Sequence, residues 1–182
     1  MSDIQYYRTR SELLDLIPEN SNILEIGVFK GDFSKEIIKK TKFNNLFFVD
    51  IWHGEYGSGD KDGNNHLIVE SMESVYISLY KQAMDKPNIH LIRMDSVNFL
   101  KNWYNDYFDA IYIDGDHTEE VVYNDLILSL DRIKSGGLLM GHDYGSCHGV
   151  TSAVSRFCEQ YNQKLIGLAM DGCQSFVIKI SK

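Results

Sequence analysis

Two short clusters of carboxylate and imidazole side chains are the part of this 182-residue sequence best suited to proton transfer. The first is Asp114-Gly115-Asp116-His117 and the second is His142-Asp143. A histidine has a reference pKa of about 6.5, so His117 can act as a general base near neutral pH. Alternatively, His117 caps a helix that begins near Thr118 and orients the neighbouring carboxylates. His142 and Asp143 are the other candidate bases.

A turn with two glycines lies upstream, in Glu25-Ile26-Gly27-Val28-Phe29-Lys30-Gly31. Glycine lets the backbone approach a ligand closely, and a helix that starts after the turn offers free N–H groups. The spacing differs from the G-x-G-x-x-G pattern of nicotinamide enzymes, because the third glycine is missing and Glu25 leads. We therefore expect a ligand without a pyrophosphate, although two glycines alone indicate only a tight turn.

Further polar residues follow the next two apolar segments. Asp50 comes about 20 residues after the glycine turn, where a carboxylate can accept hydrogen bonds from ribose hydroxyls. Ile51 and Trp52 could cover the face of an adenine base. The carboxylate of Asp95, which precedes Ser96, could meet the adenine amino group, cap the following helix, or do both. Together these positions favour a nucleoside-containing ligand.

The elements that must position these residues are short apolar runs alternating with longer amphipathic stretches. This pattern is typical of buried parallel strands joined by helices. The expected strands are residues 23–28, 46–51, 89–94, 108–113 and 138–141. Two more strands, 165–169 and 175–180, are too close for a crossover helix and should form an antiparallel hairpin. We predict an α/β fold with a Rossmann-like doubly wound sheet of seven strands, mostly parallel with a C-terminal antiparallel hairpin.

The length predicts one domain over residues 1–182. Residues 1–20 should form an N-terminal helical segment, with a short helix around residues 11–17 that stops at Pro18. Residues 52–66 are rich in Gly and Asp, lack a regular pattern and follow the second strand, so we expect an irregular active-site loop, or else a mobile surface loop. The apolar spacing from Leu67 to Ala83 predicts a helix.

The composition argues against several classes of partner. The formal net charge is −8, which disfavours nucleic acids and anionic membranes because their phosphates would be repelled. No apolar run approaches the roughly 20 residues of a membrane span, and the N-terminus lacks the apolar region of a signal peptide. Cys147, Cys158 and Cys173 show no CxxC spacing, which favours a reducing compartment. We expect a cytoplasmic protein.

The sequence resembles class I S-adenosylmethionine-dependent methyltransferases. Within that class it is similar to the small-molecule and sugar O-methyltransferases of the macrocin type. The resemblance extends from about Asn22 to the C-terminus and keeps the order of the family's motifs. These motifs are Ile23-Leu24-Glu25-Ile26-Gly27, Val49-Asp50-Ile51-Trp52, Tyr112-Ile113-Asp114-Gly115-Asp116-His117, Leu130-Asp131-Arg132-Ile133-Lys134-Ser135-Gly136-Gly137, His142-Asp143-Tyr144 and Gly149-Val150.

The resemblance implies a cofactor, S-adenosylmethionine, and a role for each matching residue. The cofactor-binding positions would be Glu25, Gly27, Gly31, Asp50, Ile51, Asp95, Ser96 and Asp114. The catalytic residues would be Asp114, beside the transferred methyl group, with His117 and Asp143. The expected reaction is O-methylation of a small acceptor, in a chain that could form a homodimer. N-methylation, metal-independent transfer and a non-catalytic binding module stay open, although intact Asp114, His117 and Asp143 argue against the last.

The resemblance also raises the question of a metal ion. In metal-using relatives, the counterpart of Asp114 joins two acidic or amide residues after the fifth strand to hold magnesium. Here that pair is His142-Asp143, and the histidine departs from the pattern because magnesium prefers oxygen ligands. A set of Asp114, His142 and Asp143 would also suit manganese, iron or zinc. The same residues could instead bind substrate without a metal.

Overall fold

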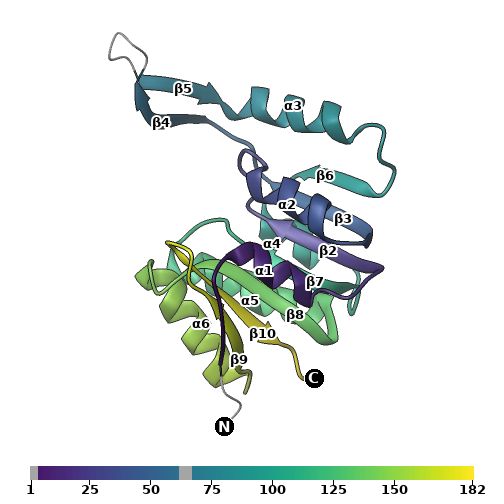
Figure 1. Cartoon of the computed structure of the whole chain (residues 1–182), viewed down its shortest axis with the longest axis vertical. Coiled ribbons are helices and arrows are strands. Elements are labelled where there is room, and N and C mark those ends of the chain that lie inside the picture. The colour runs from purple at the N-terminus through teal and green to yellow at the C-terminus, as the bar shows by residue number, and fades with distance from the viewer. Residues whose placement is uncertain (1–3, 62–66) are drawn as a thin grey trace.

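The computed structural model describes residues 4–61 and 67–182, with side chains described outside 55–70. Its centre is an eight-stranded sheet in the order β1-β9-β10-β8-β7-β2-β3-β6 (Figure 1). The strands of this sheet are β1 (Gln5–Tyr7), β2 (Ser21–Ile26), β3 (Phe43–Asp50), β6 (Ile89–Arg93), β7 (Phe108–Ile113), β8 (Ile133–Tyr144), β9 (Leu165–Ala169) and β10 (Gln174–Lys179).

The middle of the sheet is parallel and buried on both faces. β2 pairs in parallel with β3 and β7, β7 with β8, and β3 with β6. β10 runs antiparallel to both β8 and β9. The predicted fold class, with its C-terminal antiparallel hairpin, is therefore confirmed.

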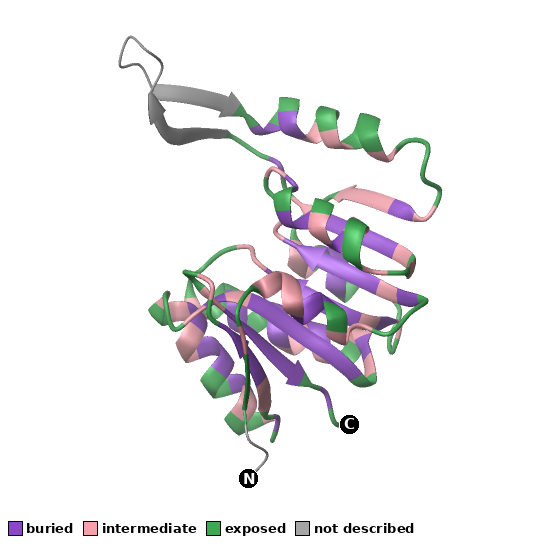
Figure 2. Cartoon of the chain, viewed as in Figure 1, coloured by how far each residue is buried: buried purple, intermediate pink, exposed green. Residues whose placement is uncertain are grey.

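Helices cover both faces of the sheet and divide the core into two layers (Figure 2). On one face pack α4 (Ser96–Lys101), α5 (Glu119–Arg132) and α6 (His148–Gln160). On the other pack α1 (Arg10–Leu13), the 3-10 turn η1 (Leu14–Leu16), α2 (Asp32–Lys40) and α3 (Met72–Ala83). No helix in the described ranges is both long and apolar enough to cross a bilayer.

The N-terminal segment agrees with its prediction only in part. The short helix expected around residues 11–17 is present as α1 and η1, but the residues before it are not helical. Gln5–Tyr7 form strand β1, which pairs in parallel with β9 at the sheet edge and raises the number of strands from the predicted seven to eight. The register places Gln5 opposite Gly167 and Tyr7 opposite Ala169. This pairing joins residues far apart in sequence, so local periodicity could not reveal it.

The segment after β3 also differs from its prediction. Instead of an irregular loop over 52–66, β4 (Glu55–Lys61) pairs antiparallel with β5 (Leu67–Ser71), and both project from the main sheet (Figure 1). Residues 62–66, within the same predicted loop, lie outside the described part. The helix expected from Leu67 begins at Met72, because Leu67-Ile68-Val69 belong to β5, as the β-propensity of Ile and Val favours.

Candidate functional site

A cleft of about 710 Å³ opens at the carboxyl ends of β2, β3, β6 and β7. Ligands of open α/β sheets bind at this edge, where the helices leave the strands. Seven of the eight predicted cofactor-binding residues line the cleft: Glu25, Gly27, Asp50, Ile51, Asp95, Ser96 and Asp114. The structure thus brings together residues from four separate strand ends.

Gly27 forms the closest backbone contact in the cleft. Its φ is +82°, and a Cβ atom placed there would lie 2.2 Å from the carbonyl oxygen of Asp114. The N–H of Asp114 donates to the carbonyl of Ile26 at 2.8 Å. The glycine turn and the end of β7 are therefore in direct contact, which only a residue without a side chain permits.

Gly31 is the one predicted cofactor-binding residue that does not line this cleft. It precedes α2 with a φ of +75°, and a Cβ there would meet the side chain of Leu79 at 2.7 Å. Leu79 belongs to α3, on the opposite side of the turn from the cleft lining. The structure therefore relates this glycine to the turn and to helix packing.

Asp50 presents a carboxylate whose position is fixed by the backbone around it. Oδ2 accepts the N–H of Phe29 at 2.9 Å, and Oδ1 accepts the N–H of Trp52 at 2.8 Å. A carboxylate has about four lone-pair sites, so both oxygens can still accept a hydroxyl proton. The arrangement fits the predicted binding of ribose hydroxyls.

Ile51 and Trp52 have different surroundings, although both were expected to cover an adenine ring. Ile51 is exposed and lines the cleft. Trp52 is 1% exposed and packs in the core, 5.0 Å from the ring of Tyr76 between centroids. Its Nε1 donates to the carbonyl of Phe29 at 3.1 Å. The expectation for Trp52 is wrong, because its indole packs in the core.

Asp95 and Ser96 lie where β6 gives way to α4. Asp95 caps α4 by accepting the N–H of Asn98 at 2.9 Å, and its hydrogen bonds with Asn98 lower the pKa of the Asp95 carboxyl. Ser96 Oγ donates to Asp125 Oδ1 at 2.6 Å. The capping alternative for Asp95 is thus present in a residue that also lines the cleft.

Asp125 is a cleft residue that the sequence analysis missed. It is 2% exposed on α5, and burial raises the pKa of its carboxyl to about 6. A usable signal existed, because Asp125 lies beside Leu126 on the face of α5 that carries the apolar stripe. A carboxylate in such a stripe is costly to bury without a partner or a role.

Glu25 lies on the floor of the cleft and is 1% exposed. Ser34 Oγ lies 2.6 Å from its carboxyl oxygen Oε2 and donates to it. Burial raises the pKa of Glu25 to about 8, so the carboxyl is largely protonated at neutral pH. A neutral carboxyl can both donate and accept hydrogen bonds in the cleft.

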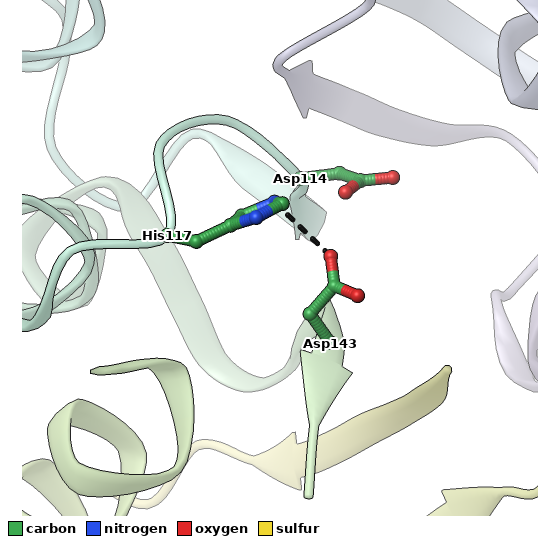
Figure 3. A group of neighbouring side chains, drawn as sticks. All are labelled: Asp114, His117 and Asp143. Atoms are coloured by element: carbon green, nitrogen blue, oxygen red, sulfur yellow. Dashed lines mark ion pairs between the residues drawn. The ribbon is translucent and has the colours of Figure 1, made fainter. Parts of the chain in front are cut away.

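Asp114, His117 and Asp143 form a cluster beside the cleft (Figure 3). Asp114 directly follows β7, His117 lies in the loop before α5, and Asp143 lies near the end of β8. His117 Nε2 lies 3.1 Å from Asp143 Oδ2. One ligand atom from each of the three side chains lies within 4.8 Å of the other two. The predicted catalytic residues therefore meet in space.

His142 lies between the two carboxylates of this cluster. Its Nδ1 is 3.2 Å from Asp143 Oδ2 and 3.6 Å from Asp114 Oδ1. The neighbouring carboxylate of Asp114, followed by that of Asp143, raises the pKa of His142, which favours the protonated ring. A protonated imidazole neither accepts a proton nor ligates a metal.

The donor atoms fit a divalent metal ion. In the described residues, the set with three converging donors is Asp114, His117 and Asp143, with His117 where the sequence suggested His142. Two carboxylates and one imidazole suit manganese, iron or zinc better than magnesium.

Arg10 reaches the same region from α1 and was not predicted. Its Nη1 lies 3.3 Å from Asp114 Oδ2, 104 residues later in the chain. The guanidinium stacks on Phe33 at 4.5 Å from the ring centroid, and the backbone N–H donates to Asp171 Oδ2 at 2.8 Å. Only the tertiary structure joins these residues, so no local pattern indicated a role for Arg10.

The sequence pattern of a family described as a methyltransferase domain matches residues 24–144. That range holds all the cleft residues except Arg10. No curated protein matches the sequence.

Similar solved structures include spermidine synthase from Thermotoga maritima (17% identity, TM-score 0.60), with 94% of this chain covered. The chain spans 57% of that synthase's length. The N-methyltransferase NodS from Bradyrhizobium japonicum WM9 is 13% identical with a TM-score of 0.64, and 95% of each chain is covered. A candidate methyltransferase from Streptococcus mutans, solved in complex with SAH, is 13% identical with a TM-score of 0.64, covering 93% of this chain and 94% of that one. These likenesses show the fold.

Proposed function

This chain belongs to the methyltransferase domain family, and from that premise we propose that it methylates a hydroxyl oxygen of a small, polyhydroxylated acceptor such as a sugar. The chain is an S-adenosylmethionine-dependent methyltransferase, so the cofactor supplies the methyl group on a sulfonium sulfur. A hydroxyl nucleophile must lose a proton during transfer. The observation that carries the proposal is the cluster of Asp114, His117 and Asp143 beside the cleft.

The cleft fits the cofactor by the chemistry of its lining. Asp50 supports ribose binding because its two oxygens are held by backbone N–H groups and keep free lone pairs. Asp95 and Ser96 line the cleft at the end of β6, on the adenine side of this arrangement. Gly27 contacts the backbone at the end of β7 with no side chain between them, on the side that we assign to the methionine portion.

His117 is the base that we propose. Asp143 Oδ2 accepts a hydrogen bond from His117 Nε2 in the tautomer with hydrogen on Nε2. Nδ1, which lies 3.9 Å from Cys147 Sγ, then carries the lone pair that takes a proton. His142 is less suited, because the adjacent carboxylates of Asp114 and Asp143 favour the protonated ring. A positioned base contributes about 10²- to 10⁴-fold to the rate.

A metal ion is a second way to lower the pKa of the acceptor hydroxyl. Asp114, His117 and Asp143 would hold it, and it would polarise the bound oxygen as a Lewis acid. The ring of His117 would then act as a ligand beside the two carboxylates, and not as the base. Activity in the presence of a chelator separates the two arrangements.

The charge of the cleft supports a neutral acceptor. Seven carboxyl groups line it: Glu25, Asp32, Asp50, Asp95, Asp114, Asp116 and Asp125. The net charge of the whole chain is −8. An anionic acceptor or a nucleic acid would be repelled, whereas sugar hydroxyls can donate to carboxylates.

The test is an acceptor screen that follows release of S-adenosylhomocysteine. Mass spectrometry and NMR of the product then locate the new methyl group on oxygen or nitrogen. Transfer to sugar hydroxyls supports the proposal. Exclusive transfer to amines would show an N-methyltransferase instead.

Two further measurements define the role of the cluster. His117→Ala should lower kcat by about 10²- to 10⁴-fold. His90→Gln is the matched control, because His90 lies on the edge strand β6 outside the cleft lining. Full activity in EDTA would remove the metal from the mechanism and leave His117 as the base. Loss of activity that manganese or zinc restores would support the metal.

A further inference from the structure

We propose that Arg10 binds the α-carboxylate of S-adenosylmethionine and makes the enzyme selective for cofactors that carry this group. The inference rests on the cofactor of the proposed function. Arg10 lies outside residues 24–144, the range that matches the family, so membership of the family assigns it no role. The case depends on where the cleft provides positive charge.

The charged groups that line the cleft are mostly of the same sign as the carboxylate of the cofactor. Against six lining aspartates and the largely protonated Glu25, the described lining contains two permanently cationic side chains, Arg10 and Lys30. An unpaired carboxylate in a partly buried site is costly, so it must meet one of these cations.

The order of strands decides which cation is near the amino-acid end of the cofactor. Asp50 and Asp95, at the ends of β3 and β6, mark the nucleoside side. Asp114 follows β7, which is three strand positions from β6, or roughly 14 Å at the usual spacing. A cofactor whose adenosine lies over β3 and β6 therefore extends its methionine portion toward β7.

Arg10 lies at this β7 end. Its Nη1 is 3.3 Å from Asp114 Oδ2 and its guanidinium stacks on Phe33. Lys30 lies in the turn beside Phe29, whose N–H binds Asp50 and so belongs to the nucleoside side. Arg10 is thus the cation placed to meet the carboxylate.

The chemistry of the guanidinium suits this role. It has five N–H donors in a planar fork, and a carboxylate binds such a fork through two parallel hydrogen bonds. Asp114 takes one donor and the hydroxyl of Tyr112 also interacts with the guanidinium, so at least two of the five donors remain for a ligand. Stacking on Phe33 and the bond from the Arg10 backbone to Asp171 fix the side chain before binding.

The experiment compares S-adenosylhomocysteine with its decarboxylated analogue, the thioether that keeps the amine and lacks the carboxylate. Calorimetry on the wild-type protein should show that S-adenosylhomocysteine binds on the order of 10- to 100-fold more tightly. Arg10→Met should reduce this affinity ratio to near one, mainly by weakening the binding of S-adenosylhomocysteine. Arg10→Lys keeps the charge without the fork and should give an intermediate ratio.

Two other substitutions provide controls. Arg8→Met removes an arginine from the same segment, where the side chain is 92% exposed and pairs with Glu12, and it should keep the wild-type ratio. Lys30→Met removes the other lining cation and should also keep the ratio. Thermal unfolding checks that each variant is folded, and the wild-type comparison needs no variant.

Three results would overturn the inference. The first is equal binding of both compounds by the wild-type protein. The second is an Arg10→Met variant that weakens both equally, since Arg10 would then only position Asp114. The third is an affinity ratio near one in Lys30→Met while Arg10→Met keeps the wild-type ratio. Binding of neither compound to the wild-type protein would overturn the cofactor assignment together with this inference.

Discussion

Glu25 shows how a single buried carboxyl couples the cleft to pH. Its pKa is raised by burial to about 8 from an ordinary 4.5, so the folded protein keeps a proton that the unfolded chain releases. The contribution of Glu25 to the free energy of unfolding is therefore most favourable below pH 4.5. It falls as the pH rises from 4.5 to 8 and stays constant above pH 8.

The prediction is that Glu25→Gln becomes progressively more stable than the wild type as pH rises through this window. The difference in free energy of unfolding between the variant and the wild type should change by about 1.4 kcal/mol per pH unit at most. Glutamine can still accept the hydrogen bond from Ser34, so packing is retained. Urea unfolding at pH 5, 6.5 and 8 measures the trend, and the exposed Glu159→Gln is the control. A constant difference between the two proteins would contradict the raised pKa.

Asp50 is the residue that we expect to contribute most to nucleoside binding. Asp50→Asn should weaken the binding of S-adenosylhomocysteine on the order of 10- to 100-fold, because a charge-assisted acceptor for ribose hydroxyls is lost. The amide oxygen can still accept one of the N–H groups of Phe29 and Trp52, which limits structural damage.

Calorimetry on folded protein measures this effect. Asp32→Asn is the matched control, because Asp32 also lines the cleft but its carboxylate pairs with Lys35 at the surface. Equal affinities for wild type and Asp50→Asn would show that Asp50 serves only to hold the turn.

At the scale of elements, the contact between the glycine turn and β7 decides the shape of the cleft. Gly27→Ala should destabilise the fold by more than the roughly 1 kcal/mol that a positive φ costs an alanine, because its Cβ would meet Asp114 at 2.2 Å. Gly136→Ala is the matched control, with a φ of +81° and no atom within 4 Å of the new Cβ.

Chemical denaturation of both variants separates the cost of the positive φ from the cost of the contact with Asp114. S-adenosylhomocysteine affinity should fall in Gly27→Ala and persist in Gly136→Ala. If both variants lose the same stability and keep affinity, the close approach has no consequence for the cleft.

The elements that sequence alone predicted are those with a strong local signal. Continuous apolar runs identified the central strands, and the short gap between β9 and β10 identified the hairpin. Strand β1 has three residues and a partner some 160 positions later, so it left no local trace. β4 is rich in polar residues and glycine, which resemble a loop in any periodicity analysis. β5 begins with the apolar run Leu67-Ile68-Val69, which the apolar spacing up to Ala83 assigned to a helix.

The residues of the site divide in the same way, into those with a local sequence signal and those that only tertiary packing brings there. Polar residues directly after predicted strands, such as Asp50, Asp95 and Asp114, lie in the cleft because strand ends converge there. Arg10 and Asp125 come from helices, and only the packing of those helices brings them to the cleft. Trp52 was misassigned because adjacent residues after a strand point in different directions, and an indole gains most by burial.

For the whole molecule, the dominant property is negative charge, −8 overall with a carboxylate-lined cleft. An anionic acceptor should therefore react slowly at low salt. Its kcat/KM should rise as ionic strength increases from 10 to 200 mM, because the screening length falls from about 30 Å to below 10 Å.

A matched neutral acceptor is the control for this prediction and should show little change. Steady-state rates at saturating S-adenosylmethionine isolate the effect on the acceptor. Parallel responses of the two acceptors would show that the field of the protein does not reach the acceptor site.

The hydrogen bond between the Arg10 backbone and Asp171 has a consequence for biosynthesis. Arg10 is anchored by Asp171, which is made 161 residues later. At about 5–20 residues per second, the ribosome needs roughly 10 to 30 s between the two. A nascent chain therefore carries its glycine turn and Asp50 well before Arg10 acquires its Asp171 partner, and the cleft is completed only after residue 171 has been made.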